Sequence, residues 1–206
     1  MDEPARPEGH PVACDPYLTL MADAEGVGYV HCGDGVLVVP VTADGRVLLA
    51  VEYSPAFGRE ILTLVGGCVD EGESLEEAAN RELQEELGWR AERIELLAEL
   101  HPFKYLDSRQ FLFLAQGLAP SRLQGDESHP PQARSIPLDG WLDLCLRGEL
   151  QDALAVAGLS LAQRYRAGQG RLPQNIVRAL RLGGLGSPAG LCGMDLVVPG
   201  TGREVF

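Results

Sequence analysis

Three glutamates close together in the chain are its best candidates for chemistry. Glu82, Glu85 and Glu86 stand at offsets of zero, three and four, and at about 100° per residue these offsets share one face of an α-helix. Like charges on one face repel one another unless a cation sits among them. Hard divalent cations bind carboxylate oxygens and often join them to the phosphates of a substrate. The spacing therefore favours a phosphate-handling metal site.

The alternative is a solvated acidic helix face, which is what most charge runs are. Arg81 argues against it, because it lies four residues after Glu77 and four before Glu85. At that spacing its guanidinium can brace the acidic cluster without taking the place of a metal ion.

A helix over residues 75–87 is predicted to position these groups. Ser74 followed three residues later by Glu77 forms a capping box, and Gly88 is a typical residue to follow a helix end. The opposite face carries an apolar stripe at helical spacing that should pack on a core, namely Leu75, Ala78, Ala79, Leu83 and Leu87.

The acidic helix and the loop before it contain a spaced motif: Gly67, five residues, Glu73, seven residues, Arg81-Glu82-Leu83, one residue, Glu85-Glu86, one residue, Gly88. This motif resembles the Nudix box of the Nudix hydrolases, with every fixed identity present. Trp89 departs from the family's usual aliphatic residue but is still apolar. The resemblance implies an α/β fold, the α/β/α sandwich of Nudix proteins with a mixed β-sheet. It also implies hydrolysis of a nucleoside diphosphate linked to a second moiety.

The same resemblance implies roles for the residues of the motif. Glu82, Glu86 and Glu85, with the backbone carbonyl of Gly66, are expected to hold Mg²⁺, with Mn²⁺ as an alternative; the number of ions stays open. Glu73 and Arg81 are expected to orient these ligands rather than to bind metal themselves.

Segments on either side of the box resemble Nudix enzymes that act on ADP-ribose and ADP-sugars. Arg59 and Glu60, shortly before the box, correspond to residues that touch substrate there, although an ordinary surface pair explains them equally well. Beyond the box, a loop over residues 102–109 is expected to lie over the substrate. Its candidates for stacking on a ring or holding a phosphate are Tyr105, Ser108 and Arg109.

The general base is expected on a loop beyond the box, over residues 123–134, because the box carboxylates are committed to metal. Asp126 and Glu127 are the carboxylates of that loop. Glu127 is favoured because its longer side chain reaches further towards a metal-bound water. Asp126 remains the alternative, and both acids are also compatible with an ordinary turn.

Short matches spread over residues 35–171 resemble the bacterial ADP-compounds hydrolase subfamily, which cleaves ADP-ribose, NADH and diadenosine polyphosphates: Gln116-Gly117-Leu118, Gly125-Asp126-Glu127, Pro137-Leu138 and Gly168-Gln169-Gly170-Arg171. The resemblance implies an ADP-linked small-molecule substrate and a homodimer. Two alternatives stay open. One is a Nudix enzyme for a nucleotide sugar, coenzyme A or an RNA 5′ end, and the other is a ligand sensor that does not catalyse.

Composition restricts the partners. The net charge is −13, which argues against DNA, or RNA as a nonspecific partner, because phosphate backbones are gripped by Lys and Arg. No apolar run approaches 18 residues, so no membrane span is expected. The five cysteines form no CxxC pair and are odd in number, which favours a reducing cytoplasm.

The chain is expected to divide into three parts. The first part covers residues 1–34: residues 1–16 are expected to be flexible, and 17–21 and 27–32 to form a short hairpin. Residues 35–170 form the catalytic domain, and 171–206 a Gly-rich extension. Within the domain, 36–41 and 46–53 surround an Asp-Gly turn and predict a hairpin. Further strands are expected at 60–65, 94–101, 110–115 and 134–137, and helices at 138–146 and 150–165.

Overall fold

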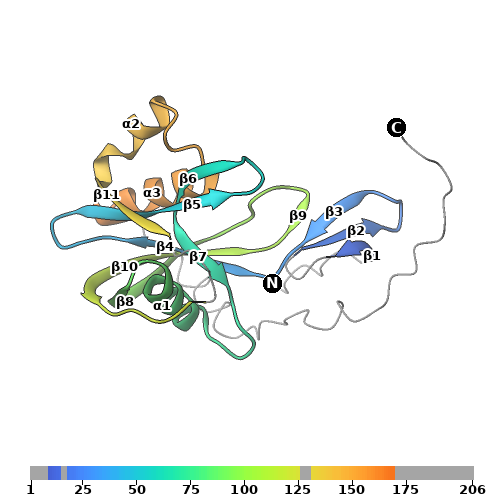
Figure 1. Cartoon of the computed structure of the whole chain (residues 1–206), viewed down its shortest axis with the longest axis horizontal. Coiled ribbons are helices and arrows are strands. Elements are labelled where there is room, and N and C mark those ends of the chain that lie inside the picture. Colours follow the sequence, from blue (N-terminus) through green and yellow to red (C-terminus); the bar gives the residue numbers. More distant parts are fainter. Residues whose placement is uncertain (1–8, 15–17, 126–130, 170–206) are drawn as a thin grey trace.

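The computed structural model describes residues 9–14, 18–125 and 131–169 (Figure 1). Its central sheet is built on β4 (Gly35–Pro40), which is buried along nearly its whole length. β4 pairs in parallel with β10 (Gln110–Pro120) and antiparallel with β7 (Val65–Cys68). β8 (Trp89–Leu100) completes the order β7-β4-β10-β8. The sheet is therefore mixed, as expected.

A second sheet contains β5 (Arg46–Ser54) between β11 (Gln132–Pro137) and β6 (Arg59–Thr63), all antiparallel. The predicted hairpin of residues 36–41 and 46–53 is therefore wrong as a pairing. The turn forms, but in the described chain the two runs are joined next to this turn by one isolated antiparallel β-bridge, between Val41 and Val47. Both runs are apolar on both faces, so each needs covering on two sides, and they separate into different sheets.

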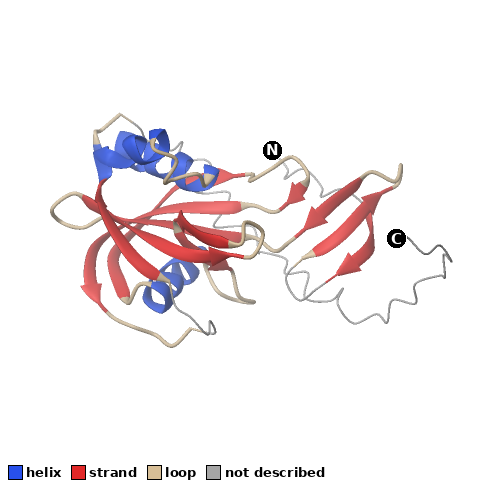
Figure 2. Ribbon diagram, turned by 45° about the horizontal axis from the view of Figure 1, so that its top comes forward, coloured by secondary structure: helices blue, strands red, loops and turns tan. Residues whose placement is uncertain are grey.

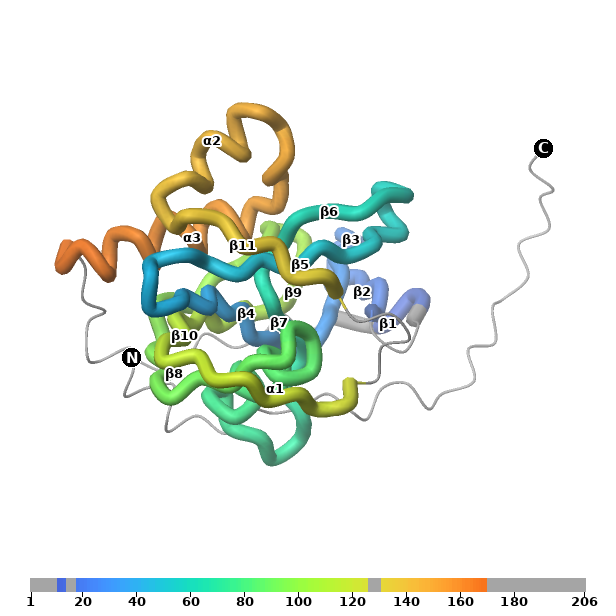
Figure 3. The backbone as a smooth tube through the Cα atoms, turned by 60° about the vertical axis from the view of Figure 1, so that its left-hand side comes forward, coloured from blue at the N-terminus to red at the C-terminus, as the bar shows by residue number. Residues whose placement is uncertain are grey.

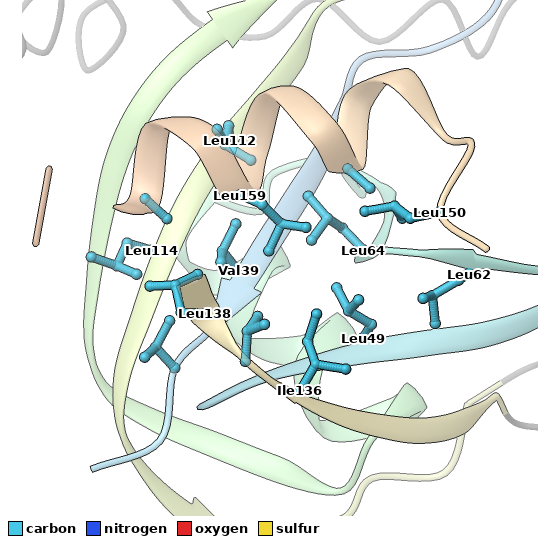
Figure 4. Close-up of a cluster of buried hydrophobic side chains, with 14 of the residues drawn as sticks. Val39, Leu49, Leu62, Leu64, Leu112, Leu114, Ile136, Leu138, Leu150 and Leu159 are labelled. Atoms are coloured by element: carbon cyan, nitrogen blue, oxygen red, sulfur yellow. The ribbon is translucent and has the colours of Figure 1, made fainter. Parts of the chain in front are cut away.

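Side chains that alternate along the strands supply two cores, one on each face. Phe111 and Phe113 of β10 pack with Leu83 of α1 (Leu75–Glu86). Leu112 and Leu114 pack on the other side with α3 (Ala153–Arg166) (Figure 4). In Figure 2 the helices lie above and below the strands, and the predicted α/β/α arrangement is confirmed.

The predicted acidic helix and its capping box are confirmed, but the expectation that all its glutamates lie opposite the apolar stripe is wrong for Glu86, which is buried with that stripe. Ser74 Oγ accepts a hydrogen bond from the backbone N–H of Glu77 at 3.2 Å, and Glu77 Oε2 accepts one from the N–H of Ser74 at 2.9 Å. The Ser74 hydroxyl also donates to Glu77 Oε2 at 2.7 Å, and this bond, together with the one from the Ser74 N–H, holds the pKa of the Glu77 carboxyl below its usual value. Gly88 follows the helix with a φ of 74°, a left-handed conformation that suits glycine.

The last helices begin slightly differently from expectation. The segment predicted over 138–146 starts as a 3₁₀ turn, η1 (Leu138–Gly140), and continues as α2 (Trp141–Leu146). α3 begins later than predicted because Asp152 caps it, accepting a hydrogen bond from the N–H of Ala155 at 2.6 Å.

A small sheet beside the catalytic body contains β1 (Gly9–Cys14), β2 (Thr19–Asp23), β3 (Gly28–His31) and β9 (Leu106–Asp107). The predicted hairpin is confirmed as β2 and β3, but the flexible N-terminus is wrong for residues 9–14. β1 pairs along the outer edge of β2, and Pro11 stands at an irregularity in the register, a place where a strand tolerates proline. The β5–β6 hairpin extends towards the same side as this sheet (Figures 1 and 3).

The Gly-rich extension over 171–206 lies outside the described residues. No helix of the described chain has the length and apolar character that a membrane span requires.

Candidate active site

Arg81 is the centre of the acidic cluster. Its Nε and Nη2 donate to the two carboxylate oxygens of Glu73 at 3.0 and 2.9 Å. Its Nη1 donates to Glu82 Oε1 at 2.7 Å and to Glu85 Oε2 at 3.1 Å. Nη2 also donates to the backbone carbonyl of Cys68 at 2.9 Å. One cation therefore gathers three carboxylates and ties the helix to the end of β7.

These bonds keep Arg81 charged. The hydrogen bond to Glu73 raises the pKa of the guanidinium further above its usual value, partial burial opposes the rise, and the contact with Glu82 adds to it. The guanidinium is therefore a cation, and it offsets the repulsion between the neighbouring carboxylates.

Glu86, one turn after Glu82, is held differently. Its side chain is buried, with 6% exposure, and its Oε1 accepts a hydrogen bond from the backbone N–H of Gly66 at 3.1 Å. A carboxylate in such a place requires hydrogen bonds or a cation to offset its lost hydration. Glu86 and Gly66, both predicted as metal ligands, are therefore brought together.

The glycines of β7 let this strand lie close against its neighbours. A Cβ built on Gly67 would stand 2.2 Å from Glu82 Oε1, and one on Gly66 would stand 2.2 Å from the carbonyl oxygen of Val36. The first overlap involves the end of a flexible side chain, whereas the second involves the backbone of β4. Gly67 therefore makes room for the acidic cluster, and Gly66 makes room for the sheet.

Alanine at the two glycines is expected to have different effects. Gly67→Ala should leave the melting temperature nearly unchanged but displace Glu82 and lower turnover about 100-fold, as misplacement by about 1 Å can do. Gly66→Ala should destabilise the fold by about 1–3 kcal/mol, because the strand must shift. Thermal denaturation and turnover of both variants test this. A stable, fully active Gly67→Ala variant would contradict the placement of Glu82.

The donor set suits a hard divalent cation, because the cluster offers carboxylate oxygens and backbone carbonyls. The described residues contain no group of three or more His, Cys, Asp or Glu side chains already arranged as a metal site; instead Arg81 Nη1 bridges Glu82 and Glu85. The thiol of Cys68 is not expected to be a metal ligand. Burial raises its pKa, with Cys32 and Glu82 adding to the effect, which disfavours the thiolate that binds metal.

Two predicted substrate residues lie in the second sheet, whereas Arg81 lies on α1. Arg59 and Glu60 begin β6, and both are exposed. Arg59 Nη2 donates to Gln151 Oε1, and its guanidinium lies 6.0 Å from the centre of the Phe57 ring. Their role in substrate binding stays a prediction.

The three candidates of the 102–109 loop have different surroundings. Tyr105 is exposed and meets the ring of Phe103 edge to face, with centroids 5.6 Å apart. Ser108 is buried, and its hydroxyl donates to the carbonyl of Gly33 at 3.0 Å. Arg109 forms an ion pair with Asp34 at 2.6 Å. Of the three, Tyr105 is the residue whose side chain faces solvent most fully.

Glu127 and Asp126, the two candidates for the general base, lie outside the described residues. The described segment before them is fastened to the last turn of α1. Ser121 Oγ donates to Gln84 Oε1 at 2.8 Å, and Arg122 Nη1 approaches the carbonyl of Glu85 at 3.4 Å. Sequence reasoning did not identify Gln84, Ser121 or Asp34, because a lone polar residue gives no signal of a partner distant in sequence.

Known proteins resemble this chain over most of its length. Residues 33–146 match the family model described as the NUDIX domain. The chain is 37% identical over 141 residues to the ADP compounds hydrolase NudE of Escherichia coli (strain K12), covering 68% of this chain and 75% of that protein. It is 25% identical over 135 residues to the ADP-ribose pyrophosphatase of Bacillus subtilis (strain 168), covering 64% and 73% respectively. A solved structure described as an ADP compounds hydrolase superposes with a TM-score of 0.66 and 30% identity, covering 84% of this chain and all of that one.

Proposed function

Because this chain belongs to the Nudix family of hydrolases, we propose that it cleaves the diphosphate of ADP-linked compounds such as ADP-ribose, NADH or diadenosine polyphosphates. The observation that carries the proposal is the set of carboxylates gathered by Arg81 beside the Glu86–Gly66 contact. The names of the similar proteins, an ADP compounds hydrolase and an ADP-ribose pyrophosphatase, support the choice of substrate.

Glu82, Glu85 and Glu86, with the carbonyl of Gly66, are the residues that would hold the divalent cation of this family. We take the ion to be Mg²⁺, with Mn²⁺ as a substitute, because every donor is a hard oxygen. When bound, such an ion neutralises diphosphate oxygens and lowers the pKa of an attacking water.

Arg81 and Glu73 are proposed to position the metal-binding side chains rather than to bind metal themselves. Arg81 holds the carboxylates of Glu82 and Glu85 on one side of the helix, and Glu73 fixes the guanidinium with two hydrogen bonds. Since these contacts immobilise the side chains before substrate arrives, less ordering remains to be done in the reaction. Glu127 is proposed to take the proton of the attacking water.

The substrate beyond the diphosphate is proposed to contact Arg59 and Glu60 of β6 together with Tyr105; the buried hydroxyl of Ser108 instead donates to the carbonyl of Gly33. An exposed aromatic ring such as that of Tyr105 can stack on an adenine base. A homodimer in the cytoplasm is the assembly and location that we propose.

A substrate panel tests the proposed function. Purified protein with Mg²⁺ is incubated with ADP-ribose, NADH, diadenosine triphosphate, coenzyme A, a nucleotide sugar and capped RNA, and the products are separated by chromatography. We expect AMP and ribose 5-phosphate from ADP-ribose, and no products when a chelator removes the metal. The Glu86→Gln variant, purified in parallel, controls for contaminating hydrolases.

Other outcomes of the panel would contradict the proposal. Turnover confined to coenzyme A, nucleotide sugars or capped RNA would assign a different substrate class. Tight binding of ADP-ribose without turnover of any compound would instead indicate a ligand sensor.

A further inference from the structure

Arg109 and Asp34 form an ion pair on the approach to the box, although Arg109 was expected to hold a substrate phosphate. Arg109 Nη2 and Nε donate to Asp34 Oδ2 at 2.6 and 3.1 Å, and the backbone N–H of Arg109 donates to Oδ1 at 3.1 Å. The two side chains are only 18% and 9% exposed. The guanidinium is therefore directed at a neighbouring carboxylate and shielded from solvent.

The pair stands where the two central strands begin. Asp34 immediately precedes β4 and Arg109 immediately precedes β10, and the N–H of Gly35 donates to the carbonyl of Arg109 at 2.9 Å. The guanidinium also lies over the ring of Phe111, 5.6 Å from its centre. These contacts fix the start of one strand relative to the other.

The same aspartate reaches the box loop, defined here as residues 67–74. The carbonyl of Asp34 accepts a hydrogen bond from the N–H of Val69 at 3.2 Å. Cys68, the residue before Val69, accepts one from Arg81 Nη2 through its carbonyl at 2.9 Å. A continuous series of contacts thus runs from Arg109 through Asp34 and the box loop to Arg81, which holds the acidic cluster.

We propose that Asp34 and Arg109 are a positioning pair for the reaction and that Arg109 acts through Asp34 rather than on a substrate phosphate. The ion pair keeps the backbone of Asp34 in place, Asp34 anchors Val69, and the adjoining Cys68 carbonyl sets the direction of the Arg81 guanidinium. Charges this shielded interact strongly, so removing either partner disturbs the other. The inference rests on the proposed function, because the reaction that is positioned is diphosphate hydrolysis.

Three variants test the pair: Asp34→Asn, Arg109→Gln and the double variant. If the two residues act as a unit, each single variant should lower kcat about 10- to 100-fold, as loss of a supporting contact typically does, with KM nearly unchanged. The concentration of Mg²⁺ needed for half-maximal rate should rise. The double variant should lose no more activity than the more strongly affected of the two single variants, because the effects of coupled residues do not add.

The opposite pattern would overturn the proposal. If Arg109 binds a phosphate directly, Arg109→Gln raises KM, Asp34→Asn keeps its kcat, and the effects add in the double variant. Arg93→Gln is the matched control, because Arg93 forms an ion pair with Glu95 at 3.4 Å but is 62% exposed; it should retain wild-type kinetics. If Arg109→Gln does not fold, Arg109→Lys replaces it, since lysine keeps the charge but lacks the forked donor geometry.

Amide hydrogen exchange provides a readout that does not require turnover. Measured by mass spectrometry on peptides covering the box loop, exchange should be about tenfold faster in Asp34→Asn and Arg109→Gln than in the wild type and in Arg93→Gln. Unchanged exchange in both variants would refute the pair's positioning role. If the wild type cleaves no ADP-linked compound, the proposed function fails, while exchange still decides whether the pair holds the loop.

Discussion

Glu86→Gln is expected to lower kcat about 100-fold or more, and Glu82→Gln to do the same, while both variants remain folded. Each substitution removes a negative charge from the proposed metal site and keeps the shape of the side chain. In the wild type, Glu86 accepts a hydrogen bond from the N–H of Gly66 at 3.1 Å. The amide oxygen of glutamine can accept the same bond in Glu86→Gln. The expected loss is therefore one of cation binding rather than of structure, and steady-state kinetics across Mg²⁺ concentrations measure it.

Thermal stability gives a second view of the same variants. Mg²⁺ should raise the melting temperature of the wild type, because a ligand bound to the folded state stabilises it, and this increase should shrink in both variants. Without Mg²⁺, Glu86→Gln should be at least as stable as the wild type, since a neutral amide is easier to bury than a carboxylate. Glu76→Gln, the same change on the exposed first turn of α1, serves as the control. Near-normal turnover of Glu82→Gln or Glu86→Gln at saturating Mg²⁺ would exclude this helix as the metal platform.

Glu127→Gln is expected to lower kcat about 10²- to 10⁴-fold, the usual contribution of a general base. The carboxylates of the box have other partners: Glu73, Glu82 and Glu85 accept hydrogen bonds from Arg81, and Glu86 accepts one from Gly66. We therefore predict that the general base comes from outside the box. The wild-type rate should fall as the pH is lowered and the base becomes protonated, and the variant should lose this acidic limb because glutamine does not titrate.

Asp126→Asn is the matched comparison for the general base. It removes a carboxylate from the adjacent position and should leave the pH–rate profile in place. Mg²⁺ affinity should be nearly unchanged in both variants, since neither residue is a proposed ligand. A collapse of kcat in Asp126→Asn with a normal profile in Glu127→Gln would transfer the role to Asp126. Full activity in both would show that no carboxylate of this loop acts as a base.

The acidic helix was predictable from sequence because its determinants are local. The capping box of Ser74 and Glu77 lies within one turn, and the spacing of Arg81 and Glu85 alone places them on neighbouring positions of one face. The structure accordingly contains the expected helix start and the expected contact, with Arg81 Nη1 3.1 Å from Glu85 Oε2. The predicted apolar stripe is buried, but its separation from the acidic face is wrong for Glu86, which is buried together with Leu75, Ala78, Ala79 and Leu83. Residues seven positions apart lie on nearly the same side of an α-helix, so Glu86 follows Ala79.

The pairing of strands was not predictable in the same way. An Asp-Gly turn indicates that the chain reverses, but it does not say whether the runs on either side pair with each other or with later strands. β4 instead pairs with β10, because both are apolar on both faces and the interior of the fold is the place that buries them. The role of Arg109 was hidden for a related reason: its partner, Asp34, is 75 positions away in sequence.

The parallel pairing of β4 with β10 also bears on how the protein folds. It joins Gly35 to Gln110, and such long-range contacts slow folding because a large loop must close before they stabilise the chain. The helix that carries the glutamates lies inside that loop and has its own capping signals, so it can begin to form early. The Asp34–Arg109 pair and the anchored box loop must wait until β10 docks beside β4. A nascent chain that ends before β10 therefore contains every proposed metal-binding residue without the scaffold that would make them a site.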